Sequence, residues 1–192
     1  MVLSDESDAK RVLAVLPKRF EKYGFTLHPE KTQLVAFERP RGNEKPPKGP
    51  DGGKSFDFLG FTHYWGKSRK GNYVVQRKTA GKRFRSAVKR MNEWCRSVRH
   101  FPVIEQWRQL CLKLTGYYNY YGIPGNWKSL HRFWYHVRRL WQKWLNRRAH
   151  KAKVTWEKMT ALLNRYPVPL PHVFNPYIPL ILGVCEPRSR MR

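Results

Sequence analysis

Acidic residues are scarce in this sequence and unevenly distributed. The chain of 192 residues has 13 Asp and Glu against 39 Lys and Arg, a formal net charge of +26. Residues 58–192 hold four of these carboxylates and 28 of the basic side chains. Such an excess of positive charge concentrates polyanions around a protein whatever its fold. It implies RNA, DNA or an anionic membrane as the partner class, and it assigns binding to the second part of the chain.

Cysteines and long apolar runs are also few. The three cysteines, Cys95, Cys111 and Cys185, form no CxxC pair, so they indicate reduced thiols and not a disulfide framework. No uninterrupted apolar run approaches the roughly 20 residues of a membrane-spanning helix. The start of the chain turns acidic at once, unlike a signal peptide. We therefore expect a cytoplasmic protein that has no membrane partner.

Residue patterns for metal or acid–base chemistry are missing as well. The seven histidines are scattered, and His131 and His136 lie five residues apart, which does not place two ligands on one helix face. Asp5 and Asp8 are interpreted as residues that cap a helix, and Asp57 as an exposed position on a strand. No carboxylate pair is placed to hold two magnesium ions. We expect no metal site, no cofactor and no small-molecule substrate for this chain alone.

The first part of the chain predicts a helix followed by a strand. Ser4 or Ser7 is expected to cap a helix of clear 3.6-residue period that ends at Gly24. Pro17 lies inside this helix and predicts a kink or a local break, because proline lacks a backbone donor. Residues 33–37 are rich in β-branched and aromatic side chains and predict a strand.

A hairpin is predicted after a long loop. Residues 39–54 contain four prolines and four glycines and predict a mobile loop. Residues 56–65 resume a strand pattern, and the basic turn 66–72 separates them from a second strand at 73–76. We interpret residues 1–78 as one region built from this helix, these strands and the loop.

From Thr79 onward, apolar side chains recur every three or four residues, which indicates amphipathic helices. The pattern predicts helices over about 79–98, 104–121, 130–145 and 155–164. We expect a helical domain at 79–165 and an extended, proline-rich tail at 166–192. The fold class is therefore α+β and mainly α.

The helical domain has basic faces that lack compensating acids. Between Trp127 and Thr155 there are nine Lys and Arg and no carboxylate. Like charges four residues apart on a helix repel each other by a few tenths of a kcal/mol, so phosphate contact explains this surface better than simple solvation does. The cations predicted to bind nucleic acid are Lys67, Arg69, Lys70, Arg83, Arg85, Lys89, Arg90, Arg132, Arg138, Arg139, Lys143, Arg147 and Arg148.

Aromatic side chains are the second candidate for nucleic-acid contact, since their faces stack on unpaired bases. Most of the eight tryptophans lie on the apolar stripes and are expected in the core. The run of tyrosines at 117–121 and Trp127 cannot all point inward. Tyr120 and Trp127 are therefore the predicted aromatic contacts.

Two motifs resemble a known family. Residues 19–32 read Arg-Phe-Glu-Lys-Tyr-Gly-Phe-Thr-Leu-His-Pro-Glu-Lys-Thr, and Phe56 to Phe61 read Phe-Asp-Phe-Leu-Gly-Phe. Both resemble bacterial group II intron-encoded reverse transcriptases (maturases), at the sixth and seventh conserved blocks of the polymerase. Residues 115–122 and 144–148 are similar to the thumb and maturase region of that family.

The resemblance implies a fold and a function. The fold is the end of a palm, with a helix and a β-hairpin, followed by a three- to four-helix thumb and maturase bundle. The implied partner is group II intron RNA or an RNA/DNA primer-template. Phe58, Leu59 and Gly60 match the family's primer grip. Lys31 matches a lysine thought to assist the pyrophosphate leaving group, a catalytic role that needs a complete polymerase.

The resemblance also shows a departure. The family's Tyr-x-Asp-Asp segment and an earlier aspartate, which bind two magnesium ions, are missing from the sequence, and by position that segment would lie just before Met1. We expect an RNA-binding fragment that has no polymerase activity of its own. The alternatives are one part of an RNA-directed DNA polymerase, completed by an upstream palm and fingers fragment, and a general basic nucleic-acid-binding protein.

Overall fold

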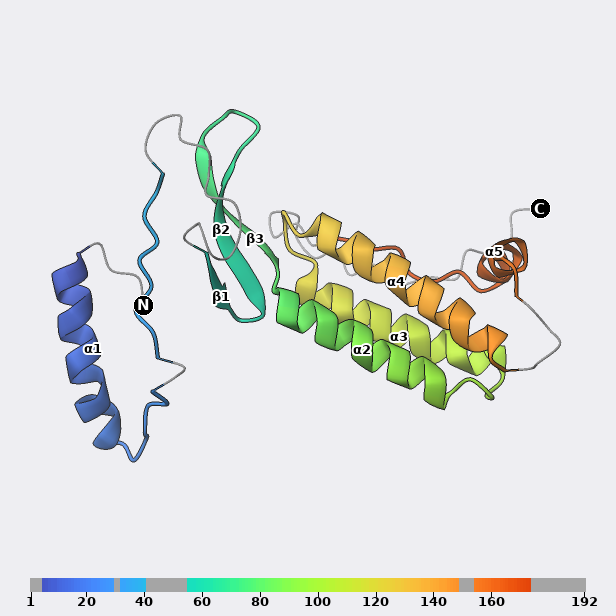
Figure 1. The fold of residues 1–192 in the computed structure, drawn as a ribbon, viewed down its shortest axis with the longest axis horizontal. Helices are drawn as coiled ribbons and strands as arrows, with labels where there is room; N and C mark the ends of the chain where they lie inside the picture. Colours follow the sequence, from blue (N-terminus) through green and yellow to red (C-terminus); the bar gives the residue numbers. More distant parts are fainter. Residues whose placement is uncertain (1–4, 30–31, 41–54, 149–153, 174–192) are drawn as a thin grey trace, which may run out of the picture. The chain divides into compact units, whose positions relative to one another are not determined.

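The protein has a mixed α+β fold that is mainly helical (Figure 1). A computed structural model of the chain describes residues 5–29, 32–40, 55–148 and 154–173. Three strands form an antiparallel sheet in the order β1-β2-β3. In chain order the elements are α1 (Glu6–Glu21), β1 (Phe56–Phe58), β2 (Phe61–Lys67), β3 (Tyr73–Thr79), α2 (Gly81–Ser97), α3 (Val103–Tyr121), α4 (Trp127–Asn146) and α5 (Trp156–Arg165).

The chain divides into two compact units. One consists of Met1–Phe56 and Trp65–Val74, and the other of Asp57–Tyr64 and Val75–Arg192. The boundary crosses the β2–β3 hairpin, so the tip of the hairpin belongs to the first unit and its base to the second. The second unit contains α2 to α5 and the segment 166–173, which together are called the helical body.

Helix α1 is capped by an aspartate. Its N-cap is Asp5, whose side chain accepts a hydrogen bond from the backbone N–H of Ser7 at 2.8 Å, so the interpretation of Asp5 as a capping residue is confirmed and the expected Ser7 cap is wrong. Ser4 lies outside the described residues. The helix runs from Glu6 to Glu21 through Pro17, so the expected local break does not occur. Ala9 is its one buried residue, and Val15 is 58% exposed.

The strand predicted at residues 33–37 does not form, and this prediction is wrong. A strand needs a neighbour that pairs with its backbone, and in the described part of the chain no strand pairs with this segment. Phe37 instead packs against two rings of the same unit, 5.0 Å from the ring centre of Phe56 and 5.1 Å from that of Trp65. The segment is thus held by contacts between aromatic rings and not by hydrogen bonds between paired strands. Lys31 and residues 41–54 of the expected loop lie outside the described residues.

The apolar run at 56–65 is two strands and not one. Leu59 and Gly60 separate β1 from β2 with backbone φ angles of 48° and 81°, and both values fall in the left-handed region that two-residue hairpin turns require. The expected hairpin with a basic turn is confirmed, since β2 and β3 flank residues 68–72.

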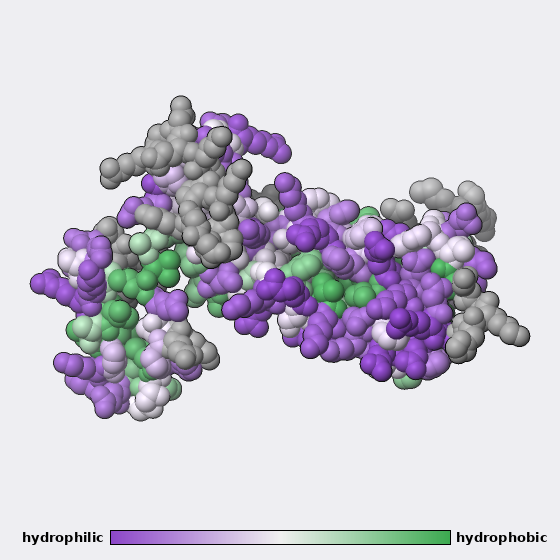
Figure 2. All heavy atoms as spheres, in the orientation of Figure 1, coloured by the Kyte–Doolittle hydropathy of each residue, from purple (hydrophilic) through white to green (hydrophobic). Residues whose placement is uncertain are grey.

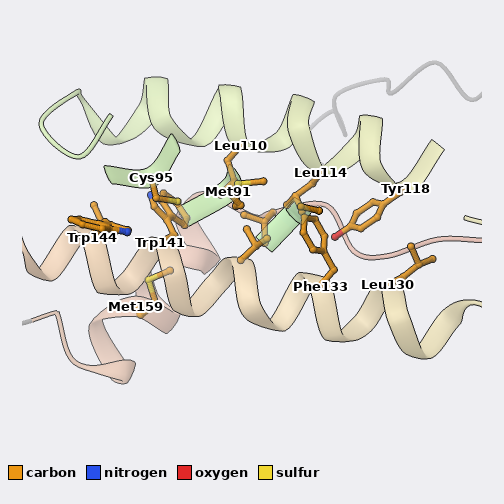
Figure 3. Packing of buried hydrophobic residues seen from close by; sticks show 14 residues of the cluster. Met91, Cys95, Leu110, Leu114, Tyr118, Leu130, Phe133, Trp141, Trp144 and Met159 are labelled. Atoms are coloured by element: carbon orange, nitrogen blue, oxygen red, sulfur yellow. The ribbon is translucent and has the colours of Figure 1, made fainter. Parts of the chain in front are cut away.

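The four predicted helices of the second part are confirmed as α2 to α5. Their apolar stripes meet in one core, to which α2 contributes Met91 and Cys95, α3 Leu114, α4 Phe133 and α5 Met159. Figure 3 shows these side chains pointing toward one another between the helices. Burial raises the pKa of the Cys95 thiol to about 12, despite the opposing charge of Lys113, so this thiol stays protonated.

Amide side chains satisfy the two buried indoles of α4. Trp141 donates from Nε1 to Oε1 of the buried Gln106 at 3.0 Å, and Trp144 donates to Oδ1 of Asn92 at 2.9 Å. Gln106 in turn donates to the carbonyl oxygen of Phe101 at 2.8 Å. Buried polar groups cost free energy unless they are paired, so these bonds fix the helices in one register.

A third side-chain amide, that of Asn126, joins the hairpin to the helices. This residue is 1% exposed and precedes α4. Its Oδ1 accepts from the backbone N–H of Thr79 at 2.8 Å, while its Nδ2 donates to Thr79 Oγ1 at 2.8 Å and to the carbonyl oxygen of Tyr121 at 2.9 Å. The end of β3, the end of α3 and the start of α4 are therefore held together.

The segment after α5 lies along α3 in an extended form. Trp107 Nε1 donates to the carbonyl oxygen of Pro167 at 2.8 Å, and the Tyr118 hydroxyl donates to that of Pro169 at 3.3 Å. Residues 166–173 form neither helix nor strand, which agrees with the predicted extended start of the tail. Residues 174–192 lie outside the described part. No helix among the described residues combines the length and apolar character needed to cross a bilayer.

Two leucines of α3 test this packing. Leu114 is 0% exposed and Leu112 is 75% exposed. We expect Leu114→Ala to lower the free energy of unfolding by about 2–5 kcal/mol, because it leaves a cavity in the core. Leu112→Ala, the matched control, changes it by no more than about 0.5 kcal/mol. Urea denaturation measures both, and equal effects would contradict the packing described.

Candidate nucleic-acid interface

One side of α4 is lined with cations. Leu130, Phe133 and Val137 lie on its buried stripe. The opposite side exposes a row at spacings of three and four residues, and a spacing of four places neighbours about 6 Å apart along the axis. The members of this outer row are Lys128, Arg132, Tyr135, Arg139 and Lys143, all of them exposed. No carboxylate lies on α4.

Helix α2 packs against α4 and adds a second set of cations. Its predicted contacts Arg83, Arg85, Lys89 and Arg90 are all exposed. The guanidinium carbon of Arg132 on α4 lies 5.4 Å from the ring centre of Phe84 on α2, so the two basic surfaces meet. Figure 2 shows hydrophilic residues over much of the visible face of the helical body.

These cations are not neutralised within the helical body. Between its described residues no ion pair forms, and its carboxylates there, Glu93, Glu105 and Glu157, are all exposed. Ion pairs do form on α1, between Lys10 and Glu6 and between Arg11 and Asp8. The positive charge of α2 and α4 is therefore available to an external anion.

Aromatic rings orient several of the cations. Arg139 lies over the ring of Tyr135 at 5.6 Å and also donates from Nη1 to its hydroxyl at 3.1 Å. Cation–π contacts of this kind restrict a flexible side chain without neutralising it. Restricting the side chain before binding lowers the entropy lost when it meets a phosphate.

Three cations converge on one indole at the far end of α2 and α4. Arg99, Lys143 and Arg147 lie 5.9, 5.5 and 5.2 Å from the ring centre of Trp144. Arg99 follows α2 and was not among the predicted contacts. It lies just past the C-cap of α2, and only the packing of α2 on α4 brings it close to Lys143 and Arg147 of α4.

The predicted residues Phe58, Leu59 and Gly60 come together with Tyr120 at the base of the hairpin. The Tyr120 hydroxyl donates to the carbonyl oxygen of Leu59 at 2.8 Å, and the Tyr120 ring stacks on Phe61 with ring centres 5.9 Å apart. Tyr120 therefore stabilises the turn. The sequence had predicted Tyr120 only as a contact for nucleic acid.

The turn displays apolar side chains. Phe58 is 58% exposed and Leu59 is 67% exposed. The backbone N–H of Ala80 donates to the carbonyl oxygen of Gly60 at 2.9 Å, which fixes the turn from its other side. The result is a rigid turn that presents two apolar side chains to solvent.

The remaining predicted cations fall into three groups. Lys67, Arg69 and Lys70 are exposed at the hairpin tip in the first unit, where Lys67 lies over the ring of Tyr73 at 5.4 Å. Arg147 and Arg148 are exposed at the end of α4. Arg138 differs, because it is half-buried with its guanidinium 4.4 Å from the ring centre of Trp134.

Burial raises the pKa of three tyrosines on α3. It raises the pKa of Tyr121, although Arg83 and Arg90 act in the opposite direction. It also raises the pKa of Tyr117 and of Tyr118. Among the described residues no three His, Cys, Asp or Glu side chains gather as metal ligands. The geometry described here provides contacts for an anion.

Comparison with known proteins gives no relative. No protein-family model, no curated protein and no solved structure matches the chain. The interface is therefore interpreted from its own geometry. Unpaired cations, ordered by rings on two packed helices, suit a polymer of phosphates, which offers many anionic groups at regular spacing.

A pair of glycines tests the hairpin turn. An alanine at Gly60 would adopt a left-handed φ of 81° and place its Cβ 3.3 Å from the Tyr121 hydroxyl oxygen. We expect Gly60→Ala to lower the free energy of unfolding by about 1–2 kcal/mol. Gly116 lies inside α3 with open space around it, so Gly116→Ala should raise it by about 0.5–1 kcal/mol. Thermal and urea unfolding measure both, and two changes of the same sign would contradict the described turn.

Proposed function

We propose that this protein is an RNA-binding fragment of a group II intron reverse transcriptase, or maturase. Its helical body corresponds in this proposal to the thumb and maturase region, and its hairpin to the end of the palm. The chain grips the intron RNA for splicing or mobility. It has no polymerase centre of its own, because the aspartates that hold the two magnesium ions are absent from its sequence.

One observation carries the binding part of this proposal. The cations of α2 and α4 form no ion pair with the described residues of the helical body, and no carboxylate lies on α4. Bringing like charges together on packed helices is unfavourable unless a polyanion compensates them. Nucleic acid supplies this compensation and releases its own counterions when it binds.

The family part of the proposal rests on the motifs at 19–32 and 56–61. The turn formed by Phe58, Leu59 and Gly60 supports it, since it is fixed by Tyr120 and exposes Phe58 and Leu59. A rigid turn with exposed apolar side chains can contact a primer strand. The same turn favours a second candidate, part of an RNA-directed DNA polymerase in which another polypeptide provides the magnesium-binding aspartates and Lys31 acts in catalysis.

Salt dependence tests the binding surface. We expect the double variant Arg132→Gln, Arg139→Gln to reduce the slope of log affinity against log salt by about 1.5, because each phosphate contact contributes about 0.7–0.9. The control is Lys10→Gln, Arg11→Gln, which removes the same charge from cations paired with Glu6 and Asp8. Its slope should stay that of the unchanged protein. Equal loss in both variants would contradict the α4 surface.

Competition between nucleic acids tests the maturase assignment. A folded group II intron RNA should displace a labelled copy of itself at a much lower concentration than an unrelated RNA duplex of equal length does. The measurement is repeated at two salt concentrations, since phosphate contacts alone weaken steeply with salt and carry no selectivity. Equal competition by both RNAs would support the general basic nucleic-acid-binding protein instead.

A further inference from the structure

A ladder of stacked side chains follows one flank of α4, beside the outer row. The ring centres of Trp127 and His131 are 6.2 Å apart, and those of His131 and Trp134 are 5.5 Å apart. The guanidinium carbon of Arg138 lies 4.4 Å from the ring centre of Trp134. These four residues are separated by four, three and four positions, so they share one stripe of the helix. We call them the aromatic ladder.

The aromatic ladder is buried at one end and open at the other. Trp134 and Arg138 are half-buried, and Trp134 packs against the core. His131 is exposed, and Trp127, in the first turn of α4, is 49% exposed. The inner pair therefore fixes the stripe, while the outer pair offers ring faces to the surroundings.

The charges next to the open end select the ligand. Lys128 and Arg132 directly follow Trp127 and His131 in sequence and are both exposed. An apolar protein segment would offer these two cations no anionic group. An unpaired nucleotide satisfies both features, because its base stacks on an aromatic face and its phosphate meets a cation.

We propose that Trp127 and His131 form a stacking site for unpaired bases of the bound RNA. This inference rests on the proposed RNA binding. It adds that the surface distinguishes unpaired bases from bases inside a duplex. Bases inside a duplex stack on each other and cannot reach a protein ring, whereas unpaired bases can. The protein therefore prefers a duplex that continues into a single strand over the blunt duplex alone.

Three RNAs and the full-length protein test the site. The first is a blunt hairpin duplex, the second carries the same duplex with a single-stranded extension of adenosines, and the third has an abasic extension of equal length. We expect the adenosine extension to raise affinity at least about fivefold over the abasic one, a factor set by the strength of a base–aromatic stack. Because the two extensions carry equal charge, the difference reports stacking alone.

Two tryptophan variants locate the effect. Trp127→Leu should lose the preference for the adenosine extension. Its slope of log affinity against log salt on the blunt duplex should stay unchanged, and this unchanged slope also shows that the variant is folded. Trp156→Leu is the matched control, because Trp156 is 45% exposed on α5 and lies outside the aromatic ladder. It should keep the preference. His131→Leu should weaken the preference as Trp127→Leu does.

The outcomes separate this inference from the proposed function. Salt-dependent binding of all three RNAs with no advantage for adenosines would overturn the stacking site and leave RNA binding intact. A preference that survives in Trp127→Leu, or disappears in Trp156→Leu, would overturn its location. Binding of none of the RNAs would overturn the proposed function itself.

Discussion

The side-chain amide of Asn126 is the constraint on which the rest of the second unit depends. It uses both its oxygen and its nitrogen at 2.8–2.9 Å to join the end of β3 to the end of α3. It also immediately precedes α4 and leaves the N-terminus of that helix without a side-chain cap. Tyr120, which holds the hairpin turn, and Trp127, which opens the aromatic ladder, both lie within six residues of it in sequence. One buried amide therefore sets the relative positions of the turn and the basic helices.

Local sequence predicted the helices well, because their apolar residues have a clear period and their ends have distinct breakers. Pro102 and Gly122 flank α3 just as the pattern requires. Strand pairing was harder to predict. Residues 33–37 have strand propensity but no pairing strand in the described part of the chain. The apolar run at 56–65 contains a turn at Leu59 and Gly60. A leucine with positive φ is uncommon, so Gly60 was the one residue whose type favoured a turn there.

The sequence predicted which helices carry the positive charge of the candidate site, but not which side chains contact one another there. Charge counts identified α2 and α4, and the exposed positions of Tyr120 and Trp127 agree with the expectation that not every aromatic side chain could turn inward. The grouping of Arg99 with Lys143 and Arg147 around Trp144 depends on two helices packing together. The bond from Tyr120 to Leu59 joins residues 61 positions apart. Neither could be read from spacing along the chain.

The lack of ion pairs among the described residues of the helical body makes its stability depend on the surrounding solution. Folding gathers like charges on α2 and α4 at a free-energy cost that small ions screen only in part. A polyanion that binds the ordered cations more tightly than the unfolded chain stabilises the folded form by mass action. Under the proposed function, the bound RNA would therefore contribute to the stability of the helical body, in the way that a structural metal ion does in a small domain.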